Sequence, residues 1–512
     1  MRVGVVGAGP AGFYTVQSLL RHAELQHRLR RIDVFESLPV PFGLVRYGVA
    51  PDHPEVKRVT NSWTQLMDRY RAIVRFYGNV HVNGRLSLDL LKKRYADGVQ
   101  GAGLFLCMGA QGGDRKLGIP GETPCIESAR AFVAWYNGHP DYADRVFLSQ
   151  RDGCVAGGGE AVIIGNGNVA LDVARMLLQA PARLHVTDCN PVAVDALAAF
   201  GAQTLHIIGR RDASNASWTA RELRELMTLA PDLKFIVHEA MRWAPTPPGL
   251  QPAQPSRTQR RALEVLRRYA GSAVIDEVGT RAQVTPRTIH FWFGLSPVRA
   301  LLGDDQRVHL ICAPNELFYD SLGQVQCRTI QDAEPVRITA SAGAVFRSIG
   351  YVVSAPWGLP LDSNQNCIRN NAGRVVGLED AVYVAGWLKH GPRGVIANTL
   401  VDAQETVAQF VSDLRQAERA TQARADGSRT HEPEVEDLLK QAGHSFVDWD
   451  GWLRIDAEEQ HRGRLCGADR RKILTRSDML RLAGGASVAD YQQNSGEGLG
   501  NRSHRTPADV AF

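Results

Sequence analysis

Val-Val-Gly-Ala-Gly-Pro-Ala-Gly is the sequence of residues 5–12, and this stretch decides the fold. The apolar residues 1–7 predict a short buried strand, and residues 10–20 predict a helix with apolar positions available for packing. In α/β proteins, a glycine-rich turn from a strand into a helix is where a dinucleotide pyrophosphate binds. Glycine turns also arise for packing alone, so the residues that follow have to distinguish the two cases.

The glycines and the next acidic residue favour a nucleotide. Gly7 permits the tight turn, Gly9 lets the backbone approach a phosphate, and Gly12 allows the helix to pack closely on the strand. Residues 31–36 predict a second strand that ends in Glu36. Its carboxylate can accept both ribose hydroxyls and would repel a 2′-phosphate. The spacing therefore predicts FAD or NAD, with candidate contacts at Gly7, Gly9, Pro10, Ala11, Gly12 and Glu36.

A second turn, Val-Ile-Ile-Gly-Asn-Gly-Asn-Val-Ala at residues 162–170, repeats the pattern with alanine as the last small residue. The next predicted strand, residues 204–209, is followed by Arg210 and Arg211 where the first site has an acid. Two guanidinium groups offer bidentate hydrogen bonds and positive charge to a 2′-phosphate. A pair of solvated arginines is the alternative, but the turn upstream favours NADP(H). The candidate contacts are Gly165, Asn166, Gly167, Asn168, Val169, Arg210 and Arg211.

Size and composition limit the remaining possibilities. A chain of 512 residues is too long for one core and predicts two domains plus an appendage. No stretch approaches the roughly 20 apolar residues that span a bilayer, so no membrane contact is expected. No basic leader precedes the first strand, which predicts a cytoplasmic location or a compartment whose leader has been removed. The eight cysteines form no C-x-x-C pair, so neither a disulfide framework nor a metal site is expected.

Several longer stretches together resemble the adrenodoxin reductase-like ferredoxin–NADP reductases, which have the glutathione-reductase-type fold. They are GAGPAGFYT (7–15), PVPFGLVRYGVAPDHP (39–54), IPGE (119–122), AFVAWYNGHP (131–140), GNGNVALDVAR (165–175) and AGWLKHGPRGVIANT (385–399). The matches run from near residue 1 to about residue 485. The resemblance implies an α/β protein with two Rossmann-like dinucleotide-binding domains, one for FAD and one for NADP, of the three-layer ββα type.

The same resemblance implies roles for single residues at the flavin. Glu36 would hold the ribose, Leu44 would contact the flavin, and Val80 would meet the adenine side. His53 would lie near the redox face as a candidate catalytic residue, because its pKa range suits hydrogen bonding or proton transfer. A histidine between prolines is more often an ordinary surface residue. Trp387, which plain core packing would also explain, and Gly394, Val395 and Ile396 would complete the flavin contacts.

At the second nucleotide the resemblance implies contacts by Arg115 and Glu222, with Glu225 as a further candidate catalytic acid near the nicotinamide. Either acid could equally be an exposed helix residue. The chain departs from the family after the arginine pair, where Asp212 stands beside the expected phosphate pocket. A negative charge there would weaken the preference for NADPH over NADH. The loop before Arg115 is one residue longer than the family pattern.

Arginines recur on the predicted helix at residues 258–269, which also carries Leu263 and Leu266 at helical spacing. A solvated amphipathic helix is one explanation. The other is a docking face for a small acidic protein, steered by opposite charge. Nucleic acid is disfavoured, because no recognition motif accompanies the arginines. The candidate docking residues are Arg221, Arg224, Arg257, Arg260 and Arg261.

The order of the motifs predicts the domains. Residues 1–110 would be the first part of the FAD domain, residues 111–345 the NADP domain, and residues 346–485 the rest of the FAD domain with a helical C-terminal segment. Residues 486–512 lack periodicity and are expected to be disordered. Residues 288–315 alternate like antiparallel strands and predict a hairpin insertion in the NADP domain.

The predicted function is electron transfer from NADPH through FAD to a ferredoxin-type iron–sulfur protein, as in a ferredoxin–NADP(+) reductase. The chain has no iron–sulfur segment of its own, so the carrier would be a separate protein. The alternatives are an NADPH-dependent flavin reductase of quinones or other small acceptors, and an electron-transfer subunit of a larger complex. A disulfide reductase is disfavoured because no C-x-x-C pair is present. A monomer or weak dimer is expected.

Overall fold

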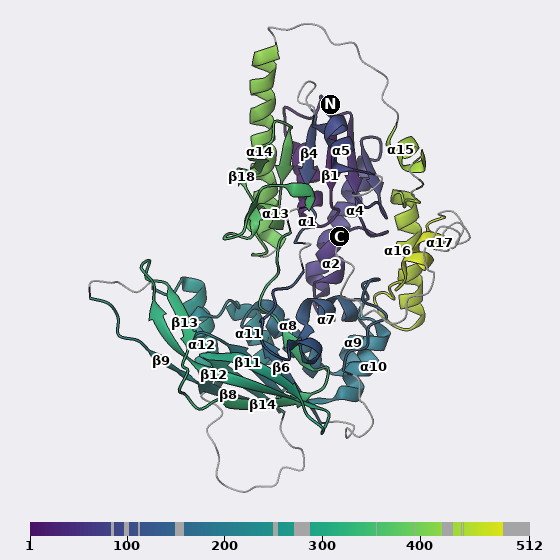
Figure 1. Ribbon diagram of the computed structural model, residues 1–512. Coiled ribbons are helices and arrows are strands. Elements are labelled where there is room, and N and C mark those ends of the chain that lie inside the picture. The colour runs from purple at the N-terminus through teal and green to yellow at the C-terminus, as the bar shows by residue number, and fades with distance from the viewer. Residues whose placement is uncertain are drawn as a thin grey trace, which may run out of the picture.

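The computed structural model describes residues 1–82, 86–96, 102–110, 113–148, 158–248, 254–270, 287–354, 356–394, 396–421, 434–441, 443 and 445–484. These residues form two α/β domains, which lie one above the other in Figure 1. A set of C-terminal helices runs along one side of the molecule. The segment 486–512, for which disorder is predicted, lies outside the described residues.

The first domain is built on a seven-stranded sheet in the order β18-β19-β20-β4-β1-β2-β3. Its parallel strands are β1 (Arg2–Val6), β2 (Arg31–Phe35), β3 (Val74–Tyr77), β4 (Gly103–Leu106) and β20 (Val382–Val384). The short strands β18 (Asn370–Asn371) and β19 (Arg374–Val375) add antiparallel pairs at one edge. The carboxyl ends of the parallel strands meet at one edge of the sheet, which brings the turn after β1 beside the end of β2.

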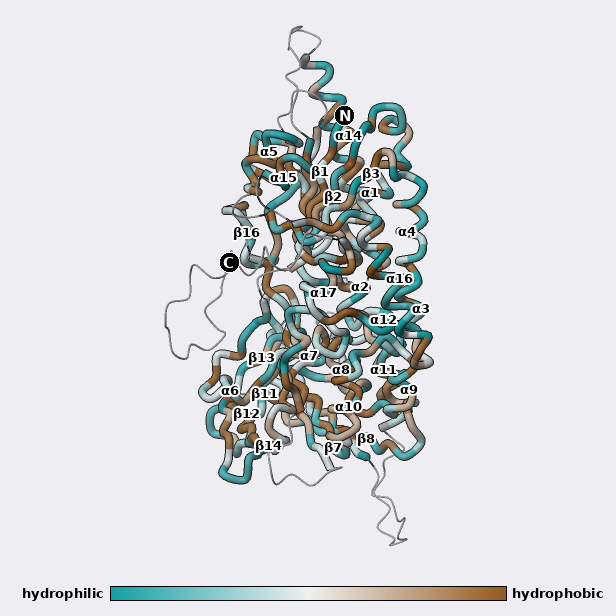
Figure 2. The backbone as a smooth tube through the Cα atoms, turned by 90° about the vertical axis from the view of Figure 1, so that its right-hand side faces the viewer, coloured by the Kyte–Doolittle hydropathy of each residue, from teal (hydrophilic) through white to brown (hydrophobic). Residues whose placement is uncertain are grey.

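Helix α1 (Pro10–Arg21) begins directly at the first glycine turn. Proline suits the first helical position because its missing N–H would have no partner there. Phe13, Val16 and Leu20 recur at helical spacing and are buried in the core of this domain. On its outer side α1 packs against α14 (Ile396–Thr421). Figure 2 shows the same pattern, with apolar residues gathered on the inner strands β1 and β2.

The second domain has a six-stranded parallel sheet in the order β5-β15-β6-β7-β10-β8. Its strands are β5 (Glu127–Ser128), β6 (Gly159–Ile164), β7 (Ala202–Gly209), β8 (Lys234–Glu239), β10 (Thr288–Phe293) and β15 (Val345–Arg347). One face is covered by α7 (Ala129–Tyr136), α8 (Asn168–Leu178), α11 (Ala220–Met227) and α12 (Arg257–Ala270).

The other face of this sheet packs on an antiparallel sheet formed by β11 (Leu295–Leu302), β12 (Arg307–Tyr319), β13 (Val325–Thr329) and β14 (Val336–Ser341), with β9 (Met241–Trp243) paired to β12. Ile164 and Ile208 of the parallel sheet share a buried cluster with Leu310 and Ile338. Helices, parallel sheet and antiparallel sheet form three layers. The predicted ββα fold class is therefore confirmed.

Two details of the second domain differ from the sequence prediction. Strand β10 alternates in burial but pairs in parallel with β7 and β8; only β11 and β12 form the expected antiparallel hairpin. Alternating burial along a strand shows that one face is better covered than the other, but it does not show whether the neighbouring strands are parallel or antiparallel. Strand β15 pairs with β5 and β6, so the second sheet continues to Arg347, two residues past the boundary predicted at residue 345.

The C-terminal helices are α15 (Val435–Gln441), α16 (Trp449–Leu465) and α17 (Arg476–Leu482). Trp452 and Ile455 of α16 are buried in the core of the first domain. The seven cysteines in the described ranges are unpaired thiols, and Cys154 lies outside those ranges. Among the described helices, none combines the length and the apolar character that a membrane crossing requires.

Candidate functional site

The first glycine turn places each of its glycines under a different constraint. Gly7 has a φ of +105°, and a Cβ there would lie 2.6 Å from the carbonyl oxygen of Cys107. A Cβ on Gly12 would lie 1.9 Å from the Gly7 carbonyl oxygen, so only glycine allows this approach of helix to strand. A Cβ on Gly9 would find nothing nearer than the Gly43 Cα at 3.9 Å. Gly9 therefore faces open space at the uncapped N-terminus of α1, which fits a pyrophosphate.

Glu36 lies directly against this turn. One carboxylate oxygen accepts a hydrogen bond from the Ala8 backbone N–H at 2.8 Å, and the other accepts from the Leu38 N–H at 3.1 Å. Burial raises the pKa of Glu36 above its ordinary value, although the backbone donors oppose that effect. The buried Val80 donates its N–H to the Glu36 carbonyl at 2.8 Å. The structure thus brings Glu36 and Val80 together at the first turn.

The segment after Glu36 folds back over the turn. Phe42 adopts a left-handed backbone with φ of +84°, and a Cβ on Gly43 would lie 3.0 Å from the Gly9 Cα. The short helix α2 (Gly43–Tyr47) therefore begins in contact with the turn. Leu44, the predicted flavin contact, is 41% exposed although it is a large apolar residue. An exposed leucine beside an open turn is suited to cover an apolar ring.

The segment that carries Trp387, a predicted flavin contact, lies far along the chain but packs against the first glycine turn. Gly386 has a φ of +68°, and a Cβ on it would lie 2.7 Å from the Ala11 Cβ. Helix α13 (Trp387–His390) follows at once. The Trp387 ring stacks on Tyr351 with 5.3 Å between the ring centroids. Trp387 therefore lies next to the residues that surround the first turn.

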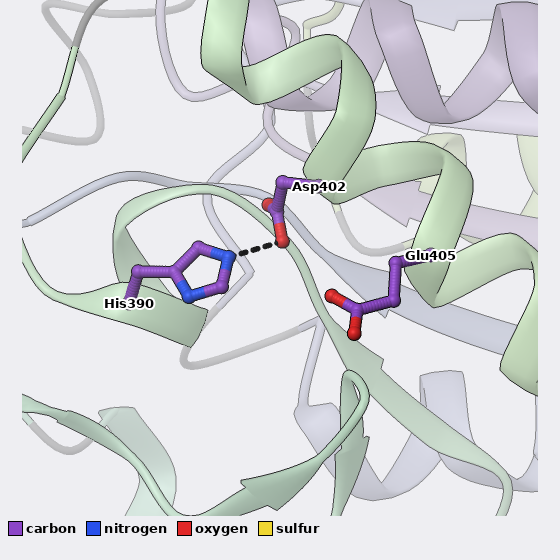
Figure 3. A group of neighbouring side chains, drawn as sticks. All are labelled: His390, Asp402 and Glu405. Carbon is purple, nitrogen blue, oxygen red and sulfur yellow. Dashed lines mark hydrogen bonds and ion pairs between the residues drawn. The ribbon is translucent and has the colours of Figure 1, made fainter.

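The buried carboxylate of Asp402 holds the segment 386–390 in place (Figure 3). It accepts hydrogen bonds from the Gly386 N–H and from His390, and it pairs with the Lys389 ammonium at 2.8 Å. Glu405 pairs with the same ammonium at 2.7 Å. His390, Asp402 and Glu405 have the chemistry of metal ligands and lie close together. The lysine already places a cation between the two carboxylates, so the cluster is a structural clamp rather than a metal site.

The three remaining residues predicted at the flavin follow the same segment. Gly394 has a φ of +87°, and a Cβ on it would meet only the Asn398 side chain, at 3.4 Å. Ile396 is the first residue of α14 and packs against the core of the first domain. Val395 lies outside the described residues. Gly394 and Ile396 therefore stand at the start of α14, and their contact with a flavin stays a prediction.

The second glycine turn repeats the geometry of the first. Gly165 has a φ of +127°, and a Cβ there would lie 2.1 Å from the Ser348 carbonyl oxygen. A Cβ on Gly167 would meet no atom within 4 Å. Helix α8 begins at Asn168 without a side-chain cap, because its N-cap residue is Gly167; the Asn168 side chain accepts from the Thr219 N–H at 2.9 Å. Gly167 and the first turn of α8 thus leave an open cradle that fits a second pyrophosphate, and its binding there stays a prediction.

Asn166 ties this turn to the chain that follows the arginine pair. Its carbonyl accepts from the Ser217 N–H at 2.7 Å, and its side chain covers Gly209 at the end of β7. The side-chain oxygen of Asn166 is buried without a hydrogen-bond partner in the described part of the chain. Ala170 is fully buried, and Val169 packs beside the helix-covered core. An unpaired buried acceptor beside the open cradle fits a site that a polar ligand completes.

Arg210 and Arg211 follow β7 directly, as predicted. Their backbone is held in place: the Arg210 carbonyl accepts from Asn315, and the Arg211 carbonyl accepts from the Gly294 N–H at 3.0 Å. Arg210 is exposed. The Arg211 guanidinium makes one long contact, at 3.5 Å, to the Val325 carbonyl. Within the described ranges neither guanidinium has an acidic partner, so both are available to a dianionic phosphate.

Asp212 does not pair with these arginines. Its carboxylate accepts from the Ser214 hydroxyl and from the Asn215 side-chain amide, both at 2.5 Å. These three residues form a local turn, and the side chain of Asp212 is directed into it. The departure from the family pattern therefore leaves the two guanidinium groups unneutralised.

His53 and Glu225, the two candidate catalytic residues, meet across the domains. His53 Nε2 lies 3.1 Å from a Glu225 carboxylate oxygen, with both side chains partly exposed. Arg221 pairs with the other Glu225 oxygen at 3.0 Å and with Glu55 at 3.0 Å. Arg221 is thus occupied by two acids, which leaves it less suited to docking than the sequence suggests.

Sequence reasoning missed an ion-pair group beside His53. Asp52 accepts two hydrogen bonds from Arg175 of α8, at 2.8 and 3.0 Å. Arg175 also pairs with Asp172 at 2.8 Å, and burial raises the pKa of Asp172 to about 6 although Arg175 opposes that effect. The three-residue spacing of Asp172 and Arg175 on one helix face was a visible signal. Its partner Asp52 belongs to the other domain and could not be identified.

The remaining predicted nucleotide contacts are less well defined. Arg115 donates its backbone N–H to the Gly350 carbonyl at 3.2 Å, while its side chain is exposed. One carboxylate oxygen of Glu222 on α11 is buried without a hydrogen-bond partner among the described residues. The Glu222 carboxylate lies close enough to Asp172 to contribute to the raised pKa of that group. The roles of Arg115 and Glu222 stay predictions.

Each domain has a glycine turn that opens a helix at the carboxyl edge of a parallel sheet. This arrangement defines the class of two-domain dinucleotide-binding oxidoreductases. A scan against protein-family models finds no match.

The mitochondrial NADPH:adrenodoxin oxidoreductase of Arabidopsis thaliana is 35% identical over 495 residues, which is 94% of this chain and 95% of that protein. The enzyme of the same name from Mus musculus is 37% identical over 490 residues, 94% of this chain and 92% of that protein. The NADPH-ferredoxin reductase FprA of Mycobacterium tuberculosis is 34% identical over 482 residues, which is 94% of this chain and 98% of that protein. The chain belongs to the NADPH:adrenodoxin oxidoreductase family.

A solved structure agrees with the sequence comparison. Mycobacterium tuberculosis FprA in complex with NADPH superposes with a TM-score of 0.79 at 34% identity, covering 94% of this chain and 99% of that one. The resemblance inferred from the sequence motifs is therefore confirmed.

Proposed function

We propose that the protein is a flavoprotein oxidoreductase that carries electrons from NADPH through FAD to a ferredoxin-type iron–sulfur protein, as a ferredoxin–NADP(+) reductase does. The observation that carries this proposal is the asymmetry of two otherwise similar glycine turns. The first lies against the buried carboxylate of Glu36, and the second precedes Arg210 and Arg211, whose guanidinium groups have no acidic partner among the described residues. An acid at this position suits a free ribose, and an arginine pair suits a 2′-phosphate.

FAD, when bound, accepts a hydride and passes the electrons on singly, which an iron–sulfur partner requires. The chain supplies binding and orientation. The uncapped N-termini of α1 and α8 hold the two pyrophosphates, and the open sides of Gly9 and Gly167 let the phosphates approach. Leu44 and Trp387 cover the flavin ring and keep water away from it.

His53 and Glu225 are proposed to act where the two domains meet. The His53 imidazole lies 3.1 Å from the Glu225 carboxylate, within ion-pair distance, so the two side chains come together where the domains meet. Such a pair can position the nicotinamide end of NADPH near the flavin. Hydride transfer itself requires no protein base, so we assign the pair to orientation and charge balance.

The proposed partner is a small acidic protein that docks on exposed arginines of the second domain. Arg224 of α11 and Arg257, Arg260 and Arg261 of α12 are exposed. Helix α12 packs on α11, the helix whose Glu225 meets His53, so these arginines lie beside the junction of the domains. Opposite charge would steer the encounter and make it sensitive to salt.

Reduction of quinones or other small acceptors by NADPH is the second candidate function. The partly exposed pair of His53 and Glu225 favours it, because a small acceptor could reach the same place. Membership in a larger electron-transfer complex would use the same arginine face. The cytoplasmic location stays a prediction, since the plant and mouse relatives are named mitochondrial and the mycobacterial one is not.

One experiment separates these functions. The purified holoprotein is supplied with NADPH, and the reduction of cytochrome c is followed with and without an acidic ferredoxin at low salt. Ferredoxin should accelerate the reduction, and charge reversal at Arg257, Arg260 and Arg261 should remove most of that acceleration. Arg299→Glu is the matched control, because Arg299 is exposed on β11 in the opposite layer of the domain. No acceleration by ferredoxin refutes the ferredoxin assignment.

The nucleotide assignment is tested in the same preparation. Arg210→Ala and Arg211→Ala should raise the KM for NADPH far more than the KM for NADH. Equal effects on the two nucleotides would refute the phosphate role of these arginines.

A further inference from the structure

The segment after α16, residues 469–476, crosses from the C-terminal helices onto both domains; we call it the strap. It runs first along the second domain. The Asp469 N–H donates to the Val186 carbonyl at 3.0 Å, and the Arg471 guanidinium donates to the Thr187 carbonyl at 2.9 Å. These bonds to backbone carbonyls fix one side of the strap to the second domain whatever side chains that domain carries.

The side chain of Lys472, the next residue, is 2% exposed and reaches both domains with one ammonium group. It pairs with Asp188 at 2.8 Å and donates to the Asn137 carbonyl at 2.9 Å, both in the second domain. It also donates to the Arg46 carbonyl at 3.0 Å, in the α2 segment of the first domain. All three donor sites of the ammonium are used, and their acceptors come from two domains.

Asp188 is shared with a cation of the first domain. Lys57, the last residue of α3 (Pro54–Lys57), lies 2.7 Å from one Asp188 oxygen and 2.8 Å from the other. Burial alone would raise the pKa of Asp188, but the Lys472 and Lys57 ammonium groups hold it below its ordinary value. The carboxylate is thus ionised, and two lysines from outside the second domain bind it.

Arg476, at the end of the strap, makes a second bridge. It pairs with Asp141 of the second domain through two bonds of 2.8 and 3.0 Å. Its third nitrogen donates to the Ser37 carbonyl at 2.9 Å. Ser37 directly follows Glu36, the acid of the first nucleotide site. One guanidinium therefore joins the edge of the first site to the second domain.

Glu459 of α16 binds the strap at Arg470 and Ile473. Its carboxylate on α16 is completely buried, accepts from the Ile473 N–H at 2.9 Å, and pairs with Arg470 at 2.9 Å. It also pairs with the buried Arg46, two residues after Leu44. The strap, α16 and the segment that covers the first turn are thus held by one network of buried charges.

We propose that Lys472 and Arg476 are positioning residues, which fix the second domain against the segment 37–57 of the first domain so that the nicotinamide end of one nucleotide meets the flavin of the other. The proposal rests on the proposed function and assigns a role to the C-terminal segment, which neither nucleotide turn needs for its own ligand. Hydride transfer requires near-contact geometry, and a misplacement of about 1 Å can cost roughly 100-fold in rate. The two nucleotides belong to different domains, so the angle between the domains sets that geometry.

The test uses the full-length holoprotein with Arg476→Ala, Arg476→Lys and Lys472→Met. The first-order loss of flavin absorbance at saturating NADPH should fall at least fivefold in Arg476→Ala and Lys472→Met. Arg476→Lys should recover part of the rate, since a lysine can keep one bond to Asp141. The Kd for adenosine 2′,5′-bisphosphate and the FAD content should not change. Amide hydrogen exchange should rise at residues 37–57 and 185–188, which reports the junction independently of activity.

Arg481→Ala is the control, because the Arg481 side chain is 65% exposed and its one acidic partner in the described part of the chain is Asp478 of its own helix. It should behave as wild type in every measurement. The proposal is overturned if the variants reduce flavin at the wild-type rate, or if rate, nucleotide affinity and FAD content fall together, as in general unfolding. A wild-type protein that NADPH fails to reduce would instead overturn the proposed function. Arg476→Ala keeps the test valid if Lys472→Met does not fold, because Arg476 is partly exposed.

Discussion

Alanine at the middle glycine of each turn should remove one nucleotide and spare the other. Gly9 and Gly167 both have ordinary extended backbone, with φ of −88° and −115°. A Cβ on Gly9 would meet only the Gly43 Cα at 3.9 Å, and one on Gly167 would meet nothing within 4 Å. Neither Gly9→Ala nor Gly167→Ala should therefore disturb the folded chain, so any loss must come from the ligand.

The expected magnitude follows from the position of the added methyl group. It would stand where the pyrophosphate approaches the helix N-terminus, and overpacking of this kind costs about 1–3 kcal/mol. That corresponds to roughly a 5- to 150-fold increase in Kd. Gly9→Ala should weaken FAD by this factor and leave NADP⁺ unchanged, and Gly167→Ala should do the reverse.

The assay is titration of the apoprotein with FAD by flavin fluorescence, and of the FAD-loaded protein with NADP⁺ by calorimetry. Gly12→Ala is the contrasting variant, because its Cβ would lie 1.9 Å from the Gly7 carbonyl oxygen and must displace α1. It should lower the thermal midpoint as well as FAD affinity. If Gly9→Ala binds FAD as wild type does, the first turn does not hold the pyrophosphate and the reasoning is wrong.

Two further predictions concern stability. Asp402→Asn should cost about 3–5 kcal/mol in the free energy of unfolding, because it removes the buried carboxylate that pairs with the buried Lys389 and leaves the exposed Glu405 as its acidic partner among the described residues. Glu405→Gln should cost under about 1 kcal/mol. Urea denaturation measures both, and similar losses would contradict the clamp. Burial, together with His290 and His238, lowers the pKa of His206 to about 3. The unfolded chain therefore takes up this proton first, so the stabilising contribution is complete above about pH 6.5 and is lost as the pH falls toward 3. The thermal midpoint of His206→Gln should decline less steeply over that range than that of wild type, and parallel pH profiles would contradict this assignment.

The parts of the site that the sequence predicts are those in which the relevant atoms are close along the chain. Gly7 and Gly12 belong to one turn, and the closest contact of a Cβ on Gly12 would be with the Gly7 carbonyl, five positions away. Arg210 and Arg211 follow their strand directly. Local geometry and charge thus suffice to predict both nucleotide turns and the difference between them.

The parts that could not be predicted depend on contacts between distant segments. Arg175 binds Asp52 at a separation of 123 positions, and nothing near either residue indicates the other. Lys472 belongs to the charged run Arg470-Arg471-Lys472, a pattern that by itself predicts a solvent-exposed surface. Its burial follows only from the way two domains and the strap meet. The direction of β10 could not be predicted for a similar reason, since its alternating burial is compatible with either direction and only its distant neighbours β7 and β8 make it parallel.

The order of strands in the first sheet has a consequence for synthesis of the chain. Leu104 of β4 pairs with Val382 of β20, and the whole second parallel sheet, from β5 to β15, is encoded between them. During translation the second domain can close its own core while the first sheet still lacks its strand β20 and the cover of α14. The ribosome therefore releases a protein whose N-terminal domain is the last to be completed. Strand β4 is paired with β1 but lacks β20 in the meantime, so its free side is the edge most exposed to wrong partners and to chaperones.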